Sequence, residues 1–440
     1  MKGDGNGFPR CVLLAATLIA CSVFPASAGA VSFFRNDVTV GTHPTSVAVG
    51  NFNGGPPDLA VANEGSDNVS ILLGNGFGQF TAGTTVPVGD APSSIVAGQF
   101  NGDAFTDLAI ASVGNDNIAI KLGDGSGGFT GSGTVSTGTN SDPRAIATGD
   151  FNNDGKTDLI SANQGASTVS ILLGDGMGGF ATDGTPFNAG ANGAANPVAI
   201  AVIQLGGTTM TPDTNLDALI ASQTNDQVLS LMGDGNGEIT GWGTNYSGSG
   251  VPGADPSALA VGALNPSSPN PAFAAEPDML IANQGVDQVW PAYGRTDGTA
   301  FDFGGVLATG DQPVAVALGD LDGDGDPDGI SANMGGGTAT TILSDGVGGT
   351  SVDTSTAVGS SPRAIATGDF DVDTKADVAV ANFDSNSISV LTSLQPGAPP
   401  PPAGNQPPAS TPTKKKKCKK KKRHHRAAEA KKKCKKKRRR

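Results

Sequence analysis

The stretch PRAIATGDFNNDGKTDLISANQGASTVSILLGDGMGGF, residues 143–180, holds every element of the unit from which this chain is built. A proline opens a run of small and branched residues, an Asp/Asn loop follows, and two short apolar runs flank an Asn-containing turn. The stretch ends in a Gly-rich turn, whose glycines supply the positive φ that a tight hairpin requires. With a weaker fourth strand after that turn, the pattern predicts a four-stranded antiparallel meander, the unit of a β-propeller blade.

The same unit recurs seven times along the chain. Its opening proline returns at spacings of 48, 51, 54, 59, 57 and 49 residues, about the length of one propeller blade. We therefore expect an all-β fold over residues 31–395, a seven-bladed β-propeller of four-stranded antiparallel blades. The openings are PTSVAVGNF from Pro44, PSSIVAGQF from Pro92, PRAIATGDF from Pro143, PVAIAVIQL from Pro197, PSALAVGAL from Pro256, PVAVALGDL from Pro313 and PRAIATGDF from Pro362.

The two ends of the repeat region fit a closed ring. The last unit runs out after its third strand, residues 387–394, while an unassigned strand, residues 31–40, precedes the first unit. We predict that this N-terminal strand completes the seventh blade, since closure removes exposed sheet edges. A solenoid is the alternative for repeats of this length, but it needs capping units, and the sequence contains none.

Composition agrees with a repeat fold rather than a helical one. The 440 residues include 65 glycines, and only 16% are charged. Residues 31–395 contain no cysteine, so disulfides do not hold the folded part together. The same residues carry 7 Lys or Arg against 39 Asp or Glu, a net charge of about −32. Packing, backbone pairing and metal binding are the remaining sources of stability.

Three units place acids at odd spacing in the loop between the first and second strands. Calcium takes six to eight oxygens from a flexible loop, and side chains at positions 1, 3, 5 and 9 with a carbonyl at position 7 supply them. Glycine at position 6 allows the bend, although Thr374 replaces it in the third loop. The predicted Ca²⁺ ligands are Asp150, Asn152, Asp154, Lys156 and Asp158; Asp320, Asp322, Asp324, Asp326 and Asp328; and Asp369, Asp371, Asp373, Lys375 and Asp377.

The other units lose this pattern by degrees. The second keeps Asn101, Asp103 and Asp107 but has Gln99 at the first position. The loop of the first unit is one residue short, and the fourth and fifth units have lost the pattern. Asx turns, in which acids only accept hydrogen bonds from the backbone, are the alternative for all of these loops. Four carboxylates within nine residues repel one another unless a cation lies among them, which favours calcium.

The pattern GDFNNDGKTDLISAN followed by VSILLGDGMGGF resembles the FG-GAP or VCBS repeat, the unit of the integrin α-subunit propeller and of many secreted bacterial proteins. The resemblance covers roughly residues 31–395. It implies a seven-bladed ring with calcium in the three intact loops. The family includes adhesion modules and accessory domains of enzymes, so the resemblance implies no single function.

Few residues of the ring are suited to catalysis. Residues 31–395 contain one histidine, three glutamates and two tyrosines, and no nucleophile elbow or zinc spacing. His43 precedes Pro44 at a blade junction, which is typical of a hydrogen-bonded turn histidine. Arg144 and Arg363 occupy one position in two units and either bind an anionic group at the rim of the channel or pair with the acidic body. We predict a binding protein, with a polysaccharide-acting hydrolase or lyase as the alternative.

The N-terminus predicts an export signal over residues 1–30. A basic start and an apolar run, residues 11–24, precede small residues at which cleavage is expected, near Ala28 or Ala30. Leu18-Ile19-Ala20-Cys21 resembles a lipobox, so lipid anchoring at Cys21 is the alternative. The apolar run is short for a membrane span. Both interpretations place the protein outside the cell, secreted or associated with the cell wall.

The C-terminus predicts a Pro-rich linker, residues 396–412, and a disordered basic tail, residues 413–440. The tail holds 19 Lys or Arg against one acid, which favours attachment to an anionic polymer or lipid of the cell envelope over nucleic acid. Between Cys418 and Cys434 a disulfide is favoured over a metal site with the neighbouring histidines. The predicted function is a calcium-binding adhesion or binding module for a surface glycan or protein.

Overall fold

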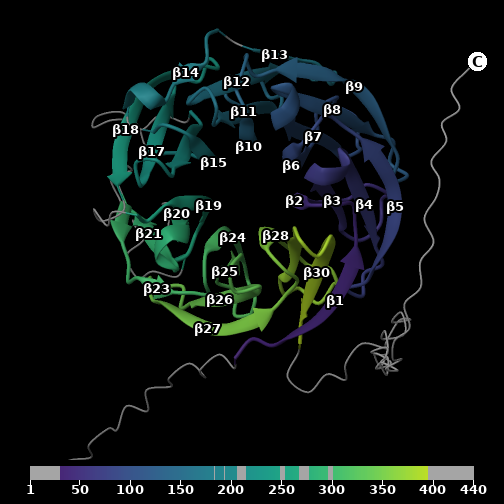
Figure 1. Ribbon diagram of the computed structural model, residues 1–440, viewed down its shortest axis with the longest axis vertical. Helices are drawn as coiled ribbons and strands as arrows, with labels where there is room; N and C mark the ends of the chain where they lie inside the picture. The colour runs from purple at the N-terminus through teal and green to yellow at the C-terminus, as the bar shows by residue number, and fades with distance from the viewer. Residues whose placement is uncertain are drawn as a thin grey trace, which may run out of the picture. The chain divides into compact units, whose positions relative to one another are not determined.

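The ring of seven sheets is the dominant feature of the computed structural model (Figure 1). The structure describes residues 30–182, 184–192, 194–205, 215–247, 253–266, 277–295 and 301–394. The predicted export signal with Cys21, the Pro-rich linker and the basic tail lie outside these residues. No helix among the described residues is long and apolar enough to cross a membrane.

Each blade begins on the predicted proline and runs outward through four strand positions. Blade 1 contains β2 (Pro44–Gly50), β3 (Asp58–Asn63), β4 (Asn68–Gly74) and β5 (Phe80–Pro87). Blade 2 contains β6 (Pro92–Gly98), β7 (Asp107–Ser112), β8 (Asn117–Gly123) and β9 (Phe129–Ser136). Blade 3 contains β10 (Pro143–Gly149), β11 (Asp158–Asn163), β12 (Thr168–Gly174) and a split outer strand, β13 (Phe180–Thr182) with β14 (Phe187–Asn188).

Blades 4 to 7 repeat this order. They contain β15 (Pro197–Ile203), β16 (Asp217–Ser222), β17 (Gln227–Gly233) and β18 (Ile239–Ser247); β19 (Pro256–Gly262), β20 (Asp278–Asn283), β21 (Gln288–Gly294) and the split β22 (Phe301–Phe303) with β23 (Leu307–Ala308); β24 (Pro313–Gly319), β25 (Asp328–Asn333), β26 (Thr338–Ser344) and β27 (Thr350–Ala357); and β28 (Pro362–Gly368), β29 (Asp377–Asn382), β30 (Ser387–Ser393) and β1 (Phe33–Thr39). Short 3₁₀ turns are η1 (Glu64–Ser66), η2 (Val113–Asn115), η3 (Gly190–Asn192) and η4 (Gln284–Val286).

The predicted closure of the ring is confirmed. The N-terminal strand β1 pairs antiparallel with β30, with Phe33 opposite Ser393 and Thr39 opposite Ser387. The paired part is slightly shorter than the predicted residues 31–40. Blade 7 therefore takes its outer strand from the start of the chain, and the exposed edge of β30 disappears.

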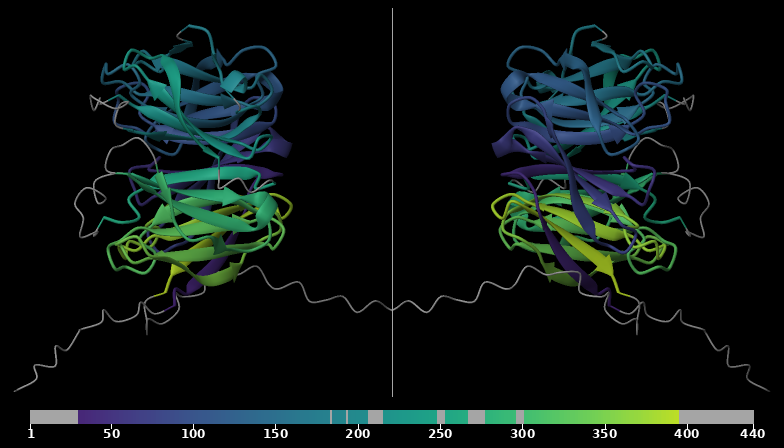
Figure 2. Two further views of the ribbon diagram at one scale, coloured as in Figure 1. Left: turned by 90° about the vertical axis from the view of Figure 1, so that its left-hand side faces the viewer. Right: turned by 90° about the vertical axis from the view of Figure 1, so that its right-hand side faces the viewer.

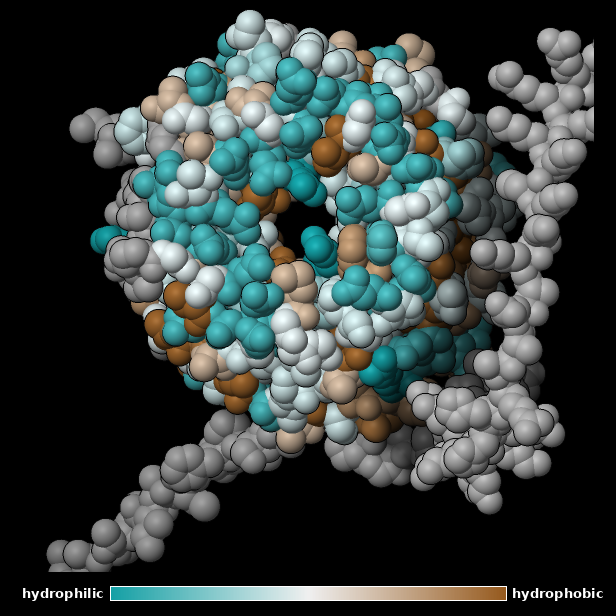
Figure 3. All heavy atoms as spheres, in the orientation of Figure 1, coloured by the Kyte–Doolittle hydropathy of each residue, from teal (hydrophilic) through white to brown (hydrophobic). Residues whose placement is uncertain are grey.

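The core consists of clusters in which the strands of consecutive blades pack against each other. The second strand of every blade is buried along its whole length, because it is covered by sheets on both sides. An opening remains at the centre of the space-filling view (Figure 3). The small residues of the first strands line up around the ring axis, where neighbouring first strands contact each other.

Antiparallel strands put the connections of each blade at two opposite faces of the ring, which Figure 2 shows edge-on. We call "loop face" the face with the loops between first and second strands and the hairpins between third and fourth strands. We call "turn face" the face with the turns between second and third strands and the links that enter the next proline. The predicted calcium loops lie on the loop face, and His43 lies on the turn face.

A recurring clamp joins neighbouring blades on the loop face. The second residue of the loop in one blade is a phenylalanine whose carbonyl accepts a hydrogen bond from the glycine that is fifth in the hairpin of the next blade, counted from Gly174 in blade 3, as in Gly178 N to Phe100 O at 2.8 Å. Its ring packs edge-on against the phenylalanine that starts the fourth strand of that next blade, as in Phe100 on Phe180. The other such backbone bonds are Gly127 to Phe52, Gly237 to Phe151 and Gly78 to Phe370.

A second clamp joins blades on the turn face. The residue before each opening proline has positive φ, and its N–H is held in most blades by a side chain from the turn of the preceding blade. Asn386 Oδ1, for example, accepts from His43 N at 2.8 Å and so joins blade 7 to blade 1. Equivalent acceptors are Asp67, Asp116, Ser167, Asp226 and Asp287. Blade 6 has Gly337 at this position, which offers no side chain.

Candidate metal centre

One aspartate starts the second strand of every blade and is buried. Each of these carboxylates accepts hydrogen bonds from two places, the second residue of its own loop and the end of its third strand. In blade 3, Asp158 accepts from Phe151 N at 2.9 Å and from Gly174 N at 2.8 Å. The seven residues are Asp58, Asp107, Asp158, Asp217, Asp278, Asp328 and Asp377.

Burial raises the pKa of six of these carboxyls above the usual aspartate value, namely Asp58, Asp107, Asp158, Asp278, Asp328 and Asp377. Loss of solvation is the largest cause, and it outweighs the backbone N–H groups that stabilise the charge. The pKa of Asp278 is raised to about 6, and those of Asp328 and Asp377 to about 7. Nearby acids of the loops add to the shift at Asp328 and Asp377, so negative charge is least compensated in blades 6 and 7.

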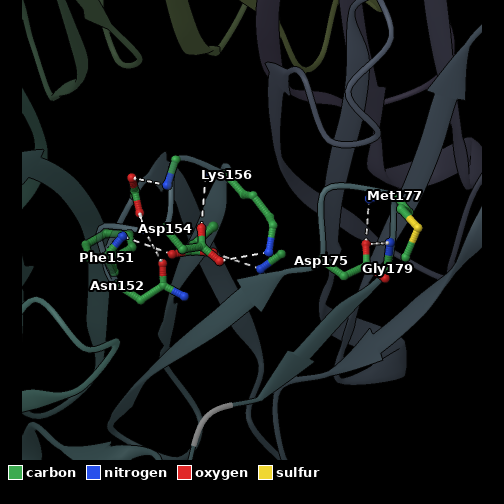
Figure 4. Close-up of polar contacts among 11 residues, drawn as sticks. Phe151, Asn152, Asp154, Lys156, Asp175, Met177 and Gly179 are labelled. Carbon is green, nitrogen blue, oxygen red and sulfur yellow. Dashed lines mark hydrogen bonds and ion pairs between the residues drawn. The ribbon is translucent and has the colours of Figure 1, made fainter.

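The loop of blade 3, residues 150–158, carries its own cation. The Lys156 ammonium lies 3.0 Å from Asp154 Oδ2 and hydrogen-bonds it, which lowers the pKa of that carboxyl (Figure 4). Asp150 accepts from Asp154 N and Gly155 N, while Asn152 Oδ1 also accepts from Asp154 N. The loop therefore has the hydrogen bonds of Asx turns together with an internal ion pair.

In the loop of blade 6, residues 320–328, three carboxylates lie close together, and we call such a group of three acids a cup. Asp320, Asp322 and Asp328 each place one oxygen within 4.8 Å of the others. Asp322 Oδ2 is buried and has no hydrogen-bond partner among the described residues. Burial, followed by repulsion from Asp324 and Asp320, raises the pKa of Asp322. A cation at this point would satisfy the unpartnered oxygen and neutralise the cup.

The loop of blade 7, residues 369–377, gathers Asp369, Asp371 and Asp373 in the same way. Asp371 Oδ1 is buried without a hydrogen-bond partner in the described part of the chain, and the pKa of Asp371 is raised to about 6, first by burial and then by its two neighbours. Thr374 takes the bend with a φ of 78°, close to the 80° of Gly155, so the missing glycine does not change the path of the loop. Such a φ strains a β-branched residue.

Lys375 connects the two cups. Its ammonium group hydrogen-bonds the Asp322 carbonyl of blade 6, and Ala376 N donates to Asp320 O at 2.7 Å. Unlike Lys156, Lys375 forms no ion pair with an acid of its own loop. The acids of blade 7 thus keep their charge while the lysine bridges to the next loop.

The structure brings together only part of each predicted ligand set. Asp324 Oδ1 accepts from Asp326 N, and neither residue joins the cup formed by Asp320, Asp322 and Asp328. Asp377 likewise lies outside the group of three acids in blade 7. The predicted carbonyl ligands of Lys156, Asp326 and Lys375 stay predictions.

The weaker loops satisfy their acids without a cation. In blade 2, Asn101 Nδ2 donates to Asp103 Oδ2 at 2.7 Å, which takes the place a metal would have. In blade 1, Asn51 closes the short loop on itself through Gly54 N and Gly55 O. Parts of the loops of blades 4 and 5, residues 206–214 and 267–276, lie outside the described residues.

The candidate residues of the turn face have structural partners. His43 stacks on Phe383 with ring centroids 4.4 Å apart, and Arg363 lies 4.3 Å from the centroid of the same ring. Arg144 Nε donates to Gln164 Oε1 at 2.7 Å. These contacts replace the ion pairs with the acidic body that were one of the two expectations for the arginines.

Sequence reasoning treated Asp158, Asp328 and Asp377 as ligands and missed the wider role of their position. The signal was present, because an aspartate precedes the second apolar run in all seven units, including units 4 and 5, which have lost the spacing of the calcium loops. An aspartate that is present even where the metal pattern is absent has a structural role. Its carboxylate joins the loop to the end of the third strand within each blade through backbone hydrogen bonds.

Comparison with known proteins supports the repeat and the ring. The family described as FG-GAP-like repeat matches residues 99–161, which span the loops of blades 2 and 3. The search of curated proteins finds no significant match.

Solved structures share the fold at low sequence identity. BBS1N in its complex with ARL6DN has a TM-score of 0.55 at 14% identity, over 82% of this chain and 95% of that one. Virginiamycin B lyase from Staphylococcus aureus has a TM-score of 0.54 at 12% identity, over 82% and 99%. A putative 6-phosphogluconolactonase from Bacteroides uniformis has a TM-score of 0.55 at 12% identity, over 73% and 87%. With the matched repeat and the seven closed blades taken together, the chain is an FG-GAP repeat β-propeller.

Proposed function

We propose that this propeller is an exported, calcium-stabilised binding module that uses its loop face to bind a surface glycan or protein. The observation that carries the metal part is the pair of buried, unpartnered carboxylate oxygens, Asp322 Oδ2 and Asp371 Oδ1, each within a cup of three acids. Buried polar atoms without partners are rare in folded proteins and call for a missing ligand. A hard divalent cation that prefers oxygen ligands fits both cups.

Calcium would be held by two adjacent cups. Asp320, Asp322 and Asp328 would supply the first, and Asp369, Asp371 and Asp373 the second. Extracellular modules work at about 10⁻⁴ to 10⁻³ M calcium, so three carboxylates with carbonyls and water are sufficient for such sites. The ions would neutralise the two blades in which burial raises aspartate pKa values most.

Exposed apolar side chains favour the loop face as the binding surface. Phe77, Met177 and Val347 occupy the same position in the hairpins of blades 1, 3 and 6, and they are 73%, 75% and 50% exposed. Phe105 and Val372 extend from the loops of blades 2 and 7 on the same face. Apolar tips between acidic loops offer both contact area and orientation to a ligand.

A hydrolase or lyase is the competing function, and the described residues favour binding over it. A cavity of about 290 Å³ between blades 3 and 4 is lined by Val169, Ile171, Phe187, Ile239 and others, with Glu238 as its one carboxylate. Hydrolysis of a glycosidic bond ordinarily uses two carboxylates on either side of the bond. The cavity therefore resembles a binding pocket more than a catalytic one.

The basic tail would hold the protein to the anionic cell envelope. Its 19 Lys or Arg residues within residues 413–440 would bind phosphate or carboxylate groups in a way that salt screens. We expect the full chain to stay on isolated envelopes at low salt and to leave at high salt, and a chain lacking residues 413–440 to be released under both conditions. Equal retention of the two chains at low salt would rule out this role of the tail.

Calorimetric titration of the purified protein with Ca²⁺ tests the metal part. We expect two sites, and a rise in Tm of about 4 °C when calcium is tenfold above the Kd of both sites. The double variant Asp322→Asn, Asp371→Asn should lose both effects, while Asp103→Asn in the weak loop of blade 2 should keep them. Absence of heat and of a Tm shift in the unaltered protein would disprove calcium binding.

A glycan array probed with and without a chelator tests the binding part. Retention of a glycan that falls with Phe77→Ser or Met177→Ser, but not with Trp242→Ser, would support the loop face, because Trp242 is 54% exposed on the outer strand β18. Release of product from a polysaccharide would instead establish the enzyme. Binding that is unchanged in both hairpin variants would exclude this face.

A further inference from the structure

The interface between blades 6 and 7 lacks both recurring clamps. Blade 7 receives its fourth strand from the N-terminus, so it has no hairpin glycine to donate to the Leu321 carbonyl. On the turn face, Gly337 has no side chain to hold the residue before Pro362. On the loop face the interface is instead joined by the bonds of Lys375 and Ala376 to the blade 6 loop, and no contact described so far joins its outer edge.

The start of the folded chain supplies a fastening at the outer edge of this interface. Val31 N donates to Asp353 Oδ2 on β27 at 2.8 Å, and Thr354 Oγ1 of the same strand donates to Val31 O at 3.1 Å. Leu394 N then donates to Ser32 O at 2.8 Å. Residues 31 and 32 thus cross from the outer strand of blade 6 to the end of blade 7, beside β1 and β27 in Figure 1.

The side chain of Val31 is part of the core. It is 7% exposed and packs in the cluster that holds Leu321, Ile330 and Leu391, whereas Ala30 is exposed. Among the described residues, burial therefore begins just after the peptide bond between Ala30 and Val31. Ala28 and Ala30 are also the small residues at the third and first positions before that bond, as export peptidases require.

We infer that the export signal is removed between Ala30 and Val31, and that the α-ammonium group freed at Val31 forms an ion pair with Asp353 that fastens blade 6 to blade 7. The inference rests on the proposed export of the protein. Water, with a membrane-bound signal peptidase, breaks the C–N bond; Ala30 keeps the water oxygen in its new carboxylate, and the Val31 nitrogen takes up both protons of the water to become an ammonium group. The neutral amide donor of the uncut chain becomes a charged one.

The change of donor strengthens an existing contact rather than creating a new one. The amide–carboxylate hydrogen bond of the uncut chain is already charge-assisted, and an ammonium donor adds the attraction between two full charges at a partly buried contact. Cleavage after Ala28, or lipidation at Cys21, would leave an amide at Val31 and so forgo the ion pair. The position of the cut therefore decides how firmly the ring is closed.

The position of cleavage can be tested by expressing the full chain, with its native N-terminal signal, in a bacterial host. The secreted protein is then analysed by intact mass and N-terminal sequencing. We expect Val31 as the first residue. Export with Gly29 or Cys21 first would overturn the inference and leave the proposed export standing. An uncut chain retained inside the cell would overturn both.

Melting temperatures of two forms test the ion pair. The form that begins at Val31 should melt about 1 to 2 °C above a form that retains Gly29 and Ala30. Asp353→Asn should lower Tm by a similar amount in the first form and by clearly less in the second, while Asp302→Asn, an exposed acid on β22, should have little effect in either. Equal melting of the two unaltered forms, or equal loss on substitution, would show that the ammonium group contributes nothing.

Discussion

Two interfaces, one between blades 3 and 4 and one between blades 6 and 7, each contain an acidic loop of nearly the same sequence pattern. They are stabilised in different ways. At the first, Gly237 clamps Phe151, the Ser167 hydroxyl holds Asn196, and Lys156 neutralises the acids from within the loop. At the second, both clamps are missing, and Asp322 Oδ2 is buried without a partner. The comparison teaches that the acidic loop gathers negative charge in both blades. Blade 3 pairs this charge with a lysine of its own loop, whereas blade 6 holds the carboxylates for which we propose a metal ion.

The largest expected effect comes from the buried aspartates that the two interfaces share. Asp158→Ala and Asp328→Ala each leave at least two buried backbone N–H groups without acceptors, which costs about 2 to 6 kcal/mol of unfolding free energy. Urea unfolding would measure the loss. Only Asp328→Ala should also remove a calcium site; if both variants bind calcium as before, the two loops are equivalent and the comparison fails.

The pH dependence of the calcium-free ring should come from blades 6 and 7. The pKa values of Asp328 and Asp377 are about 7 and that of Asp371 about 6, against 3.8 for an ordinary aspartate. A carboxyl with a raised pKa in the folded state contributes stability that is complete below about pH 4 and is lost as the pH rises through 6 to 7. Without calcium, Tm should therefore be lower at pH 8 than at pH 5.5.

Two variants separate the contributions to this pH dependence. Asp371→Asn should flatten the dependence, because it removes one of the raised carboxyls. Asp154→Asn should not flatten it, because Lys156 lowers the pKa of Asp154. Calcium at pH 8 should restore the lost Tm, and a calcium-free ring that melts equally at both pH values would contradict the assignment.

Removing the Lys156 ammonium group should allow the loop of blade 3 to bind calcium. Lys156→Met frees Asp154 from its 3.0 Å ion pair, so we expect calorimetry to count a third calcium site. Lys121→Met, on β8 of blade 2, serves as the control and should leave the count at two. An unchanged count in Lys156→Met would mean that the loop geometry, not the lysine, excludes the ion.

The smallest expected effect is a gain of stability at the blade 6–7 interface. Gly337 has a φ of 61°, a conformation that Asp and Asn tolerate, and a Cβ there would meet only the Gly359 carbonyl at 3.4 Å. Gly337→Asp should supply the missing acceptor for the residue before Pro362 and raise the unfolding free energy by about 0.5 kcal/mol. Asp287→Gly in blade 5 is the converse variant, which should lower it.

The sequence predicted the ring well, because each blade repeats one order of proline, apolar runs and glycine turns, and the strand at residues 31–40 was left over to close it. The direction of long side chains could not be predicted: Lys156 and Lys375 occupy the same loop position, yet one neutralises its own loop and the other reaches the neighbouring blade. The two clamps were also missed. The loop-face clamp joins a hairpin glycine to a phenylalanine carbonyl of another blade, and the turn-face clamp depends on positive φ at non-glycine residues such as His43, which leaves no mark in composition. Both depend on three-dimensional neighbours rather than on spacing along the chain.

The pairing of β1 with β30 also sets a timetable for the ring. The ribosome makes β1 first and β30 last, and Phe33 meets Ser393, so at 5 to 20 residues per second about 20 to 70 s pass between the births of the two partners. Throughout that interval the ring stays open, because β1 has been synthesised and its partner β30 has not. Assembly therefore finishes only after the whole repeat region has emerged, and a circularly permuted chain that begins at Pro44 and joins residue 394 to residue 31 should complete its last blade without that wait.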